Sequence, residues 1–121
     1  MVHILVVDDS PTELHVIKGL LDKNGYQVST AQSGEEGVDV AKKLKPDVVL
    51  MDVVMPGLNG FQATRQLATE PATSSIPVII VTTKDQETDK VWAMRQGAKD
   101  YIVKPVKEKD LIDRINSVMA G

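Results

Sequence analysis

Short apolar runs rich in β-branched residues alternate along this chain with segments of helical periodicity. Most of these runs are almost continuously apolar, which is typical of strands in a parallel sheet covered on both faces. Because strands and helices alternate regularly, we expect repeated βα units around such a sheet. The runs expected to form strands are residues 4–7, 26–30, 48–51, 78–81 and 101–103.

Capping signals mark the expected helices. Residues 10–13 (S-P-T-E) and 33–36 (S-G-E-E) are both interpreted as capping boxes that open a helix. Gly25 and Pro46 end these two helices, and Asn59 can cap a third. A charged helix over 85–96 and a last helix with apolar residues from 111 to 119 complete five βα units. We therefore predict a single α/β domain, a doubly wound (βα)5 parallel sheet spanning residues 1–121.

Composition narrows the function classes. The 121 residues include 14 basic and 17 acidic side chains, a net charge of -3, so we expect no nucleic-acid binding. Cysteine is absent, which suits a reducing compartment and excludes a thiolate metal site. The apolar run near the N-terminus is too short for a signal peptide or a membrane span. We therefore expect a cytoplasmic protein that does not bind membranes.

Polar residues suited to phosphate or metal chemistry follow four of the predicted strands. Asp8 and Asp9 follow the first strand, Asp52 the third, Thr82 ends the fourth and Lys104 follows the fifth. The carboxyl ends of strands in an open parallel sheet meet at one edge, where ligands bind. We therefore expect these five side chains to converge on a single site.

Charge balance predicts a divalent cation at this site. Three carboxylates about 5 Å apart repel one another by roughly 3 kcal/mol per pair at an effective dielectric constant near 20. Lys104 supplies one positive charge, and a divalent cation would supply the other two. Ligands that are all oxygen favour Mg²⁺ over zinc or copper.

The same residues suit phosphoryl transfer. A bound cation with open positions can clamp a phosphoryl group, and a carboxylate can accept that group as an acyl phosphate. Asp52 is the best candidate for the acceptor, because it stands alone while Asp8 and Asp9 form a pair suited to metal. Lys104 can pair with the acceptor or a phosphoryl oxygen, and the Thr82 hydroxyl can donate a hydrogen bond to it.

Five short motifs, in this order and spacing, resemble the CheY-like receiver domain of two-component response regulators. The resemblance covers essentially the whole chain. The stretch 57–106 is further similar to PilH-type regulators of type IV pilus twitching motility. The motifs are V-D-D-S at 7–10, M-D at 51–52 with M-P-G-L-N-G at 55–60, T-T at 82–83, G-A-K-D-Y at 97–101 and K-P at 104–105.

The resemblance implies a flavodoxin-like sheet with strand order 2-1-3-4-5. It also implies that a histidine kinase or phosphotransfer domain passes phosphate to Asp52. Asp9, Asp52 and the backbone carbonyl of Val54 would bind Mg²⁺, and Asp8 would assist through the outer coordination shell or through water. Lys104 would contact the phosphoryl group.

The resemblance also implies a conformational switch. Thr82 would shift to bind the phosphoryl group, and Tyr101 would rotate inward, reshaping the face built by the fourth helix, fifth strand and fifth helix. The peptide bond before Pro105 would be cis. We expect no output domain, so the signal would leave through a protein partner on that face, or the chain would act as a phosphate sink. The sequence does not choose between the two.

Two other function classes are weighed. An aspartyl-phosphate phosphatase of the haloacid dehalogenase type needs an Asp-x-Asp motif after its first strand, which residues 8–11 (D-D-S-P) do not supply. A scaffold independent of phosphate would be favoured if the acidic or lysine positions were missing, and they are all present. We therefore expect a signalling protein and not an enzyme with a separate substrate. Trp92 is interpreted as half-buried packing, with a partner anchor as the alternative.

Overall fold

Strands and helices alternate without exception in the computed structural model, which describes residues 1–120. Gly121, the last residue of the predicted 1–121 domain, lies outside the described residues. The observed elements confirm five βα units. They are β1 His3–Val7, α1 Pro11–Lys23, β2 Gln27–Ala31, α2 Gly34–Leu44, β3 Val48–Met51, α3 Gly60–Thr69, β4 Val78–Thr82, α4 Glu87–Arg95, β5 Asp100–Val103 and α5 Glu108–Ala120.

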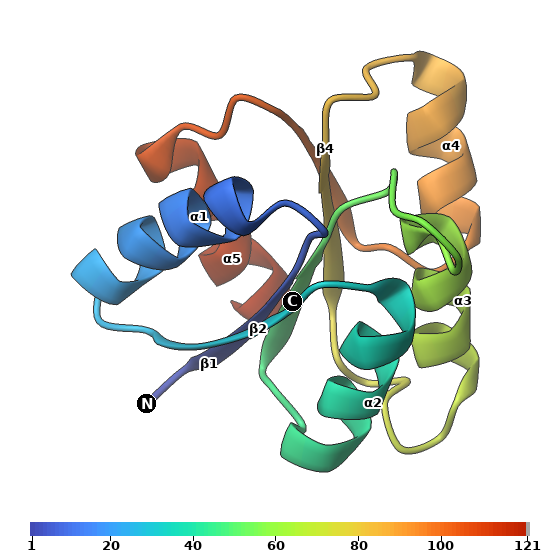
Figure 1. The fold of residues 1–121 in the computed structure, drawn as a ribbon, viewed down its shortest axis with the longest axis horizontal. Helices are drawn as coiled ribbons and strands as arrows, with labels where there is room; N and C mark the ends of the chain where they lie inside the picture. The colour runs from blue at the N-terminus through green and yellow to red at the C-terminus, as the bar shows by residue number, and fades with distance from the viewer. Residues whose placement is uncertain (121) are drawn as a thin grey trace.

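The five strands form one parallel sheet in the order β2-β1-β3-β4-β5, as predicted. Helices α1 and α5 cover one face of this sheet, while α2, α3 and α4 cover the other (Figure 1). The strand order reverses between β1 and β3, where the chain winds first to one side and then to the other. A crevice at the carboxyl ends of these two strands is the expected ligand site of such a fold.

Alternate residues of the central strand β1 supply two separate apolar layers. Ile4 and Val6 pack toward α1 and α5, whereas Leu5 and Val7 pack toward α2 and α3. All four side chains are buried. This double burial explains why the run is apolar at every position and not at every second one. A rigid, fully covered strand therefore ends directly at Asp8.

The two predicted capping boxes are each half wrong. The Ser10 hydroxyl accepts from the Glu13 amide at 3.3 Å, but the Ser10 amide donates to Asp8 Oδ1 at 2.9 Å and not to Glu13. At α2, the Ser33 hydroxyl accepts from the Glu36 amide at 3.0 Å, while the Glu36 carboxylate accepts from Gln32. At α1, Asp8 accepts the Ser10 amide in place of Glu13. At α2, the Glu36 carboxylate bonds to the amide of Gln32, one residue before the capping Ser33.

Smaller differences concern element ends. The second strand runs one residue later than predicted, so that the buried Ala31 closes it. Helix α4 is shorter than the predicted 85–96 and starts after Gln86, whose side chain makes no cap. Leu44, at the end of α2, is 51 % exposed, because the chain turns into a left-handed conformation at Lys45. Within residues 1–120, no helix has the length and apolar character needed to span a membrane.

Candidate functional site

Backbone pairing between neighbouring strands sets two aspartates side by side. Val7 of β1 is in register with Met51 of β3, so that Asp8 and Asp52 follow at adjacent strand ends. The Asp52 amide donates to the Val7 carbonyl at 2.9 Å, and the Asp8 amide donates to the Ala31 carbonyl at 3.1 Å. The sheet itself therefore fixes the spacing of the two carboxylates.

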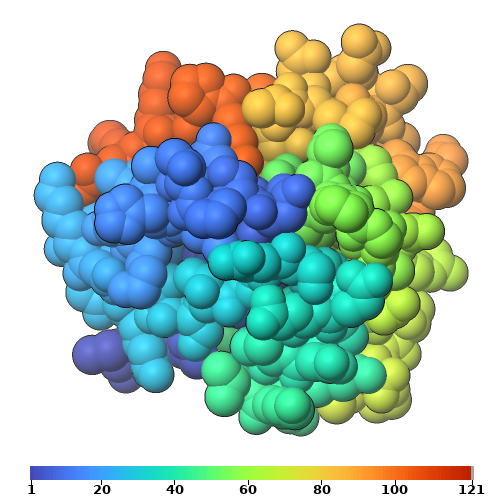
Figure 2. All heavy atoms as spheres, in the orientation of Figure 1, coloured from blue at the N-terminus to red at the C-terminus, as the bar shows by residue number. Residues whose placement is uncertain are grey.

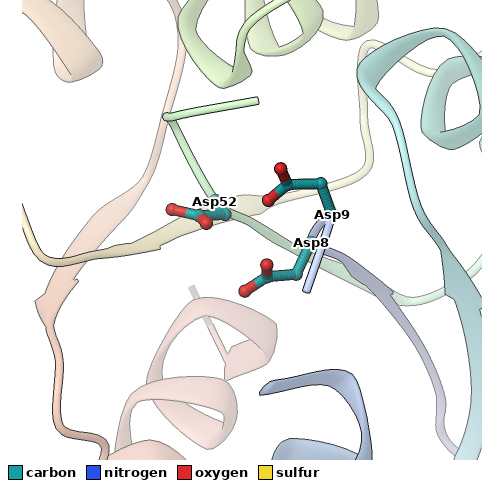
Figure 3. A group of neighbouring side chains, drawn as sticks. All are labelled: Asp8, Asp9 and Asp52. Carbon is teal, nitrogen blue, oxygen red and sulfur yellow. The ribbon is translucent and has the colours of Figure 1, made fainter. Parts of the chain in front are cut away.

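Asp8, Asp9 and Asp52 form a carboxylate cluster. One oxygen from each lies within 4.8 Å of the others, as Figure 3 shows. Asp8 is buried, Asp52 is partly buried and Asp9 is exposed, so the cluster is closed on the sheet side and open to solvent on the other. The predicted convergence of the three carboxylates is confirmed.

Lys104 lies against this cluster from the end of β5. Its Nζ donates to Asp8 Oδ2 at 2.8 Å and lies 3.6 Å from Asp52 Oδ2. The lysine therefore pairs more closely with Asp8 than with the predicted acceptor. Burial lowers the pKa of Lys104, but the hydrogen bond to Asp8 and the charge of Asp52 outweigh this effect and raise the pKa overall. The ammonium group is held charged in a site only 9 % exposed.

The surroundings of Asp52 disfavour the charged form of its carboxylate. Burial raises its pKa above the ordinary value, and the nearby charge of Asp8 adds to the effect. Lys104, a hydrogen bond from the Val53 amide at 2.7 Å and a hydrogen bond from Thr82 act in the opposite direction without cancelling it. A partly desolvated carboxylate retains basicity that a fully hydrated one loses. The fold therefore disfavours the charged form of the predicted acceptor.

Thr82 and Tyr101 lie next to the cluster, where the resemblance places the switch. The Thr82 hydroxyl is buried and accepts from the Lys84 amide at 3.4 Å. The Tyr101 hydroxyl donates to the Lys84 carbonyl at 2.9 Å, and its side chain is only 8 % exposed. Burial, together with Asp89, Asp85 and Asp52, raises the pKa of Tyr101 to about 12. Tyr101 already lies inward in this structure, and its rotation stays a prediction.

The Lys104–Pro105 peptide bond is cis, as the resemblance implied. The Lys104 amide donates to the Thr82 carbonyl at 2.8 Å, which extends the pairing of β4 with β5 up to the site. Two of the site residues are thereby tied to each other through the backbone.

The loop between β3 and α3 closes the site and contains a contact that the sequence did not reveal. Gly60 packs so tightly on the Asp52 carbonyl that a Cβ there would collide with it. The Glu35 carboxylate accepts from the Leu58 amide at 3.3 Å and lies beside Gly57, whose φ is +72°. Because Glu35 stands in the S-G-E-E run, it was interpreted only as part of a helix start. No sequence signal distinguishes the two roles.

The donor chemistry of the cluster fits Mg²⁺. All three side chains offer carboxylate oxygens, the preferred ligands of a hard divalent cation. With Lys104 counted, the formal charge of the cluster is about -2, which a dication would balance. The backbone carbonyl of Val54, in the same loop, was predicted as a further ligand and stays a prediction.

This parallel sheet, with an acidic cluster and a lysine at its carboxyl edge, defines a signalling domain of the response-regulator class. Residues 4–116 match the family model described as the response regulator receiver domain, and the chain belongs to this family. The chain is 64% identical to Protein PilH of Pseudomonas aeruginosa over 121 residues, which cover all of both chains. It is also 36% identical to Response regulator PleD of Caulobacter vibrioides over 115 residues, 95% of this chain and 25% of PleD.

Solved structures agree with this assignment. The chemotaxis protein CheY4 of Vibrio cholerae superposes with a TM-score of 0.92 at 30% identity, covering 98% of each chain. The receiver domain of a sensor histidine kinase from Pseudomonas aeruginosa superposes with a TM-score of 0.91 at 29% identity, again over 98% of each chain. That structure has a magnesium ion coordinated in its active site cleft. Receiver domains take phosphoryl groups from histidine kinases and bind downstream partners, and they bind Mg²⁺ at an acidic pocket of this kind.

Proposed function

We propose that this chain is a response regulator receiver domain that accepts a phosphoryl group on Asp52 from a histidine kinase or phosphotransfer domain, in a Mg²⁺-dependent reaction. The observation that carries the proposal is the position of Asp52. It lies among two further carboxylates, a partly buried lysine and a buried hydroxyl, and the fold disfavours its charged form. Such a group gains most from a cation and from conversion to an acyl phosphate.

Each residue of the site has a defined task in this reaction. An Asp52 carboxylate oxygen forms the new bond to phosphorus, while the bond from phosphorus to the donor nitrogen breaks and its electron pair stays on that nitrogen. Lys104, already 3.6 Å from Asp52, offsets the negative charge of the phosphoryl oxygens. Asp8, Asp9, Asp52 and the Val54 carbonyl would hold Mg²⁺, which supplies charge neutralisation and orients the transferring group.

The signal would begin with the new acceptor oxygens. Phosphorylation replaces a carboxylate by a group with a charge of about -1.5 to -2 and three strong acceptors. The Thr82 hydroxyl would turn from the Lys84 amide toward these oxygens, and Tyr101, bonded to the Lys84 carbonyl, would follow. The surface formed by α4, β5 and α5 would then change its affinity for a downstream protein, unless the chain serves as a phosphate sink.

The pathway proposed is type IV pilus twitching motility or a related chemotaxis-like system. Support comes from the full-length, 64% identity to Protein PilH and from the structural likeness to a chemotaxis protein. Pilus and chemotaxis-like kinase genes beside the gene of this chain would support the pathway, and their absence would count against it.

Phosphorylation is tested by incubation with acetyl phosphate and Mg²⁺, followed by intact-mass measurement. We expect the mass of one phosphoryl group on the wild-type chain and none on Asp52→Ala. Asp39→Ala is the matched control, because it removes an exposed carboxylate of α2 outside the cluster. Equal labelling of wild type and Asp52→Ala would refute the assignment. Turnover of small phosphoesters far beyond one phosphate per chain would instead support an enzyme.

A further inference from the structure

A hollow between α3 and α4 combines apolar side chains with free cationic ones. We propose that this groove binds an amphipathic segment of a partner protein whose apolar face is bordered by carboxylates. In Figure 2, the α3 segment (green) and the α4 segment (gold to orange) meet at the upper right of the molecule. The hollow measures about 490 Å³ and is lined by Leu58, Asn59, Phe61, Gln62, Arg65, Gln66, Trp92 and Gln96.

Partly exposed apolar side chains line the groove from both sides. Trp92 is 50 % exposed and Val91 44 % exposed on α4, and Phe61 and Leu58 are only partly buried. Single exposed apolar residues are ordinary, but a contiguous group that includes tryptophan is typical of interaction sites. Tryptophan is also among the residues that most often dominate binding energy.

A second hollow of about 380 Å³ continues from the first over the outer side of α4. Trp92 lines both, and Val91 and Arg95 line the second. The two hollows therefore form one surface that extends on both sides of Trp92. This surface is long enough to contact several side chains of a bound segment. We call this surface the α3–α4 groove.

The charged side chains at the groove indicate which kind of segment it binds. Arg65 and Arg95 border the groove and are exposed, and within residues 1–120 neither takes part in an ion pair. Glu87 is the one carboxylate among the lining residues of the two hollows. The groove is thus locally positive in a chain of net charge -3. Opposite charges on a partner would pair with the arginines and guide its approach.

Other occupants fit less well. In a two-fold dimer through this groove, the same patch would face itself and set arginine against arginine. The hollow between α2 and α3 is lined by Glu35, Asp39 and Lys42 together with uncharged residues, so it has no single sign of charge. Only the α3–α4 groove therefore joins an exposed tryptophan to unpaired cations.

The groove contains none of the residues of the phosphorylation site. The inference goes beyond the proposed function, and it is tested on unphosphorylated protein without Mg²⁺ or phosphate donor. Failure of phosphorylation and failure of groove binding are therefore separate results.

The test uses the fluorescence of Trp92, the single tryptophan of the chain. Two synthetic, tryptophan-free helical peptides share one leucine face, and its borders carry glutamates in one peptide and lysines in the other. We expect a saturable change in Trp92 emission with the glutamate peptide, weakened by salt, and a response at least tenfold weaker with the lysine peptide. The double variant Arg65→Glu with Arg95→Glu should reverse this preference.

Lys43→Glu is the control for charge reversal, since it makes half of the double variant's charge change on the exposed surface of α2. It should leave both titrations within twofold of wild type, and circular dichroism should show all variants folded. The proposal is overturned if the two peptides give equal responses, if neither saturates, or if Lys43→Glu changes binding as much as the double variant. Concentration-dependent dimers that shield Trp92 without peptide would overturn it in favour of a second copy.

Discussion

Replacing Lys104 with methionine removes the only cation within ion-pair distance of the carboxylate cluster among the residues described. The side chain keeps similar length, so the change is mainly electrostatic. In the wild type, Nζ lies 2.8 Å from Asp8 and 3.6 Å from Asp52. Without it, two partly desolvated carboxylates within 4.8 Å repel each other with nothing between them.

The expected loss follows from these distances. At 3.6 Å and an effective dielectric constant near 20, the attraction between Lys104 and Asp52 that the variant loses is about 4.6 kcal/mol before the desolvation of the ammonium group is subtracted. Breaking a buried ion pair costs roughly 3–5 kcal/mol in other proteins, which agrees. Because the pKa of Asp52 is already raised, its protonation limits the loss as the pH falls. We therefore expect Lys104→Met to lower the free energy of unfolding by about 3 kcal/mol and Tm by roughly 10 °C.

Mg²⁺ should then stabilise the variant more than the wild type. The three carboxylates of the variant carry their full charge toward a cation, whereas Lys104 offsets one charge in the wild type. Urea and thermal unfolding, followed by circular dichroism with and without Mg²⁺, give both quantities. Lys43→Met, on the exposed surface of α2, is the control and should change stability by less than about 0.5 kcal/mol. Wild-type stability of Lys104→Met, or an equal Mg²⁺ effect in both proteins, would refute this reasoning.

Three further changes test the surroundings of Asp52. Gly60→Ala should slow labelling by acetyl phosphate and cost about 1–3 kcal/mol in urea unfolding, because the added Cβ collides with the Asp52 carbonyl; unchanged labelling would contradict this. Glu35→Gln should weaken Mg²⁺ binding in a titration while changing stability by under about 1 kcal/mol, because it weakens the hydrogen bond from the Leu58 amide that holds the β3–α3 loop. Unchanged Mg²⁺ affinity would show that this hydrogen bond does not support the metal site. Asp52→Asn should be more stable than wild type at neutral pH without Mg²⁺. Because the pKa of Asp52 is raised in the folded state, ionisation of Asp52 destabilises the wild type as the pH rises, and the difference in stability between variant and wild type should vanish below pH 3.8. Urea unfolding across pH measures this difference. A difference that does not change with pH would contradict the prediction.

The site could be predicted from the sequence because its position is set by where the backbone strands end. Parallel strands end at one edge, so Asp8, Asp52 and Lys104 had to converge once their runs were recognised as strands. The sequence did not predict that Lys104 would lie closer to Asp8 than to Asp52, because that choice depends on side-chain rotation and burial. The half-wrong capping box has the same origin, since Asp8 takes the Ser10 amide. Local patterns identify a capping residue but not the competitors that the fold brings near it.

Trp92 shows the same limit at the surface. The sequence predicted half-buried packing for Trp92, with a partner anchor as the alternative, but it did not indicate which part of the side chain is left uncovered. The structure leaves it half exposed, because the buried position of α4 is Ala93, whose small side chain brings the helix close to the sheet. Whether a side chain of α4 is exposed depends on which side of the helix faces the core, and that orientation is set by the tertiary structure. The α3–α4 groove therefore had no sequence signal beyond an aromatic residue in a charged helix.

The arrangement of charge suggests how a small modification can change a surface. Before phosphorylation, three carboxylates and Lys104 carry a formal charge of about -2; afterwards, Asp8, Asp9, Lys104 and a phosphate of about -1.5 to -2 carry roughly -2.5 to -3. The total therefore changes by at most about one unit, and a bound dication would offset it in either state. What differs is position, since negative charge and three acceptor oxygens move outward from a buried strand end. The Thr82 hydroxyl accepts from the Lys84 amide at a long 3.4 Å and donates toward Asp52, so it lies where it can respond to new acceptors on that residue. The output of such a site depends on where the acceptors lie and much less on how much charge is added.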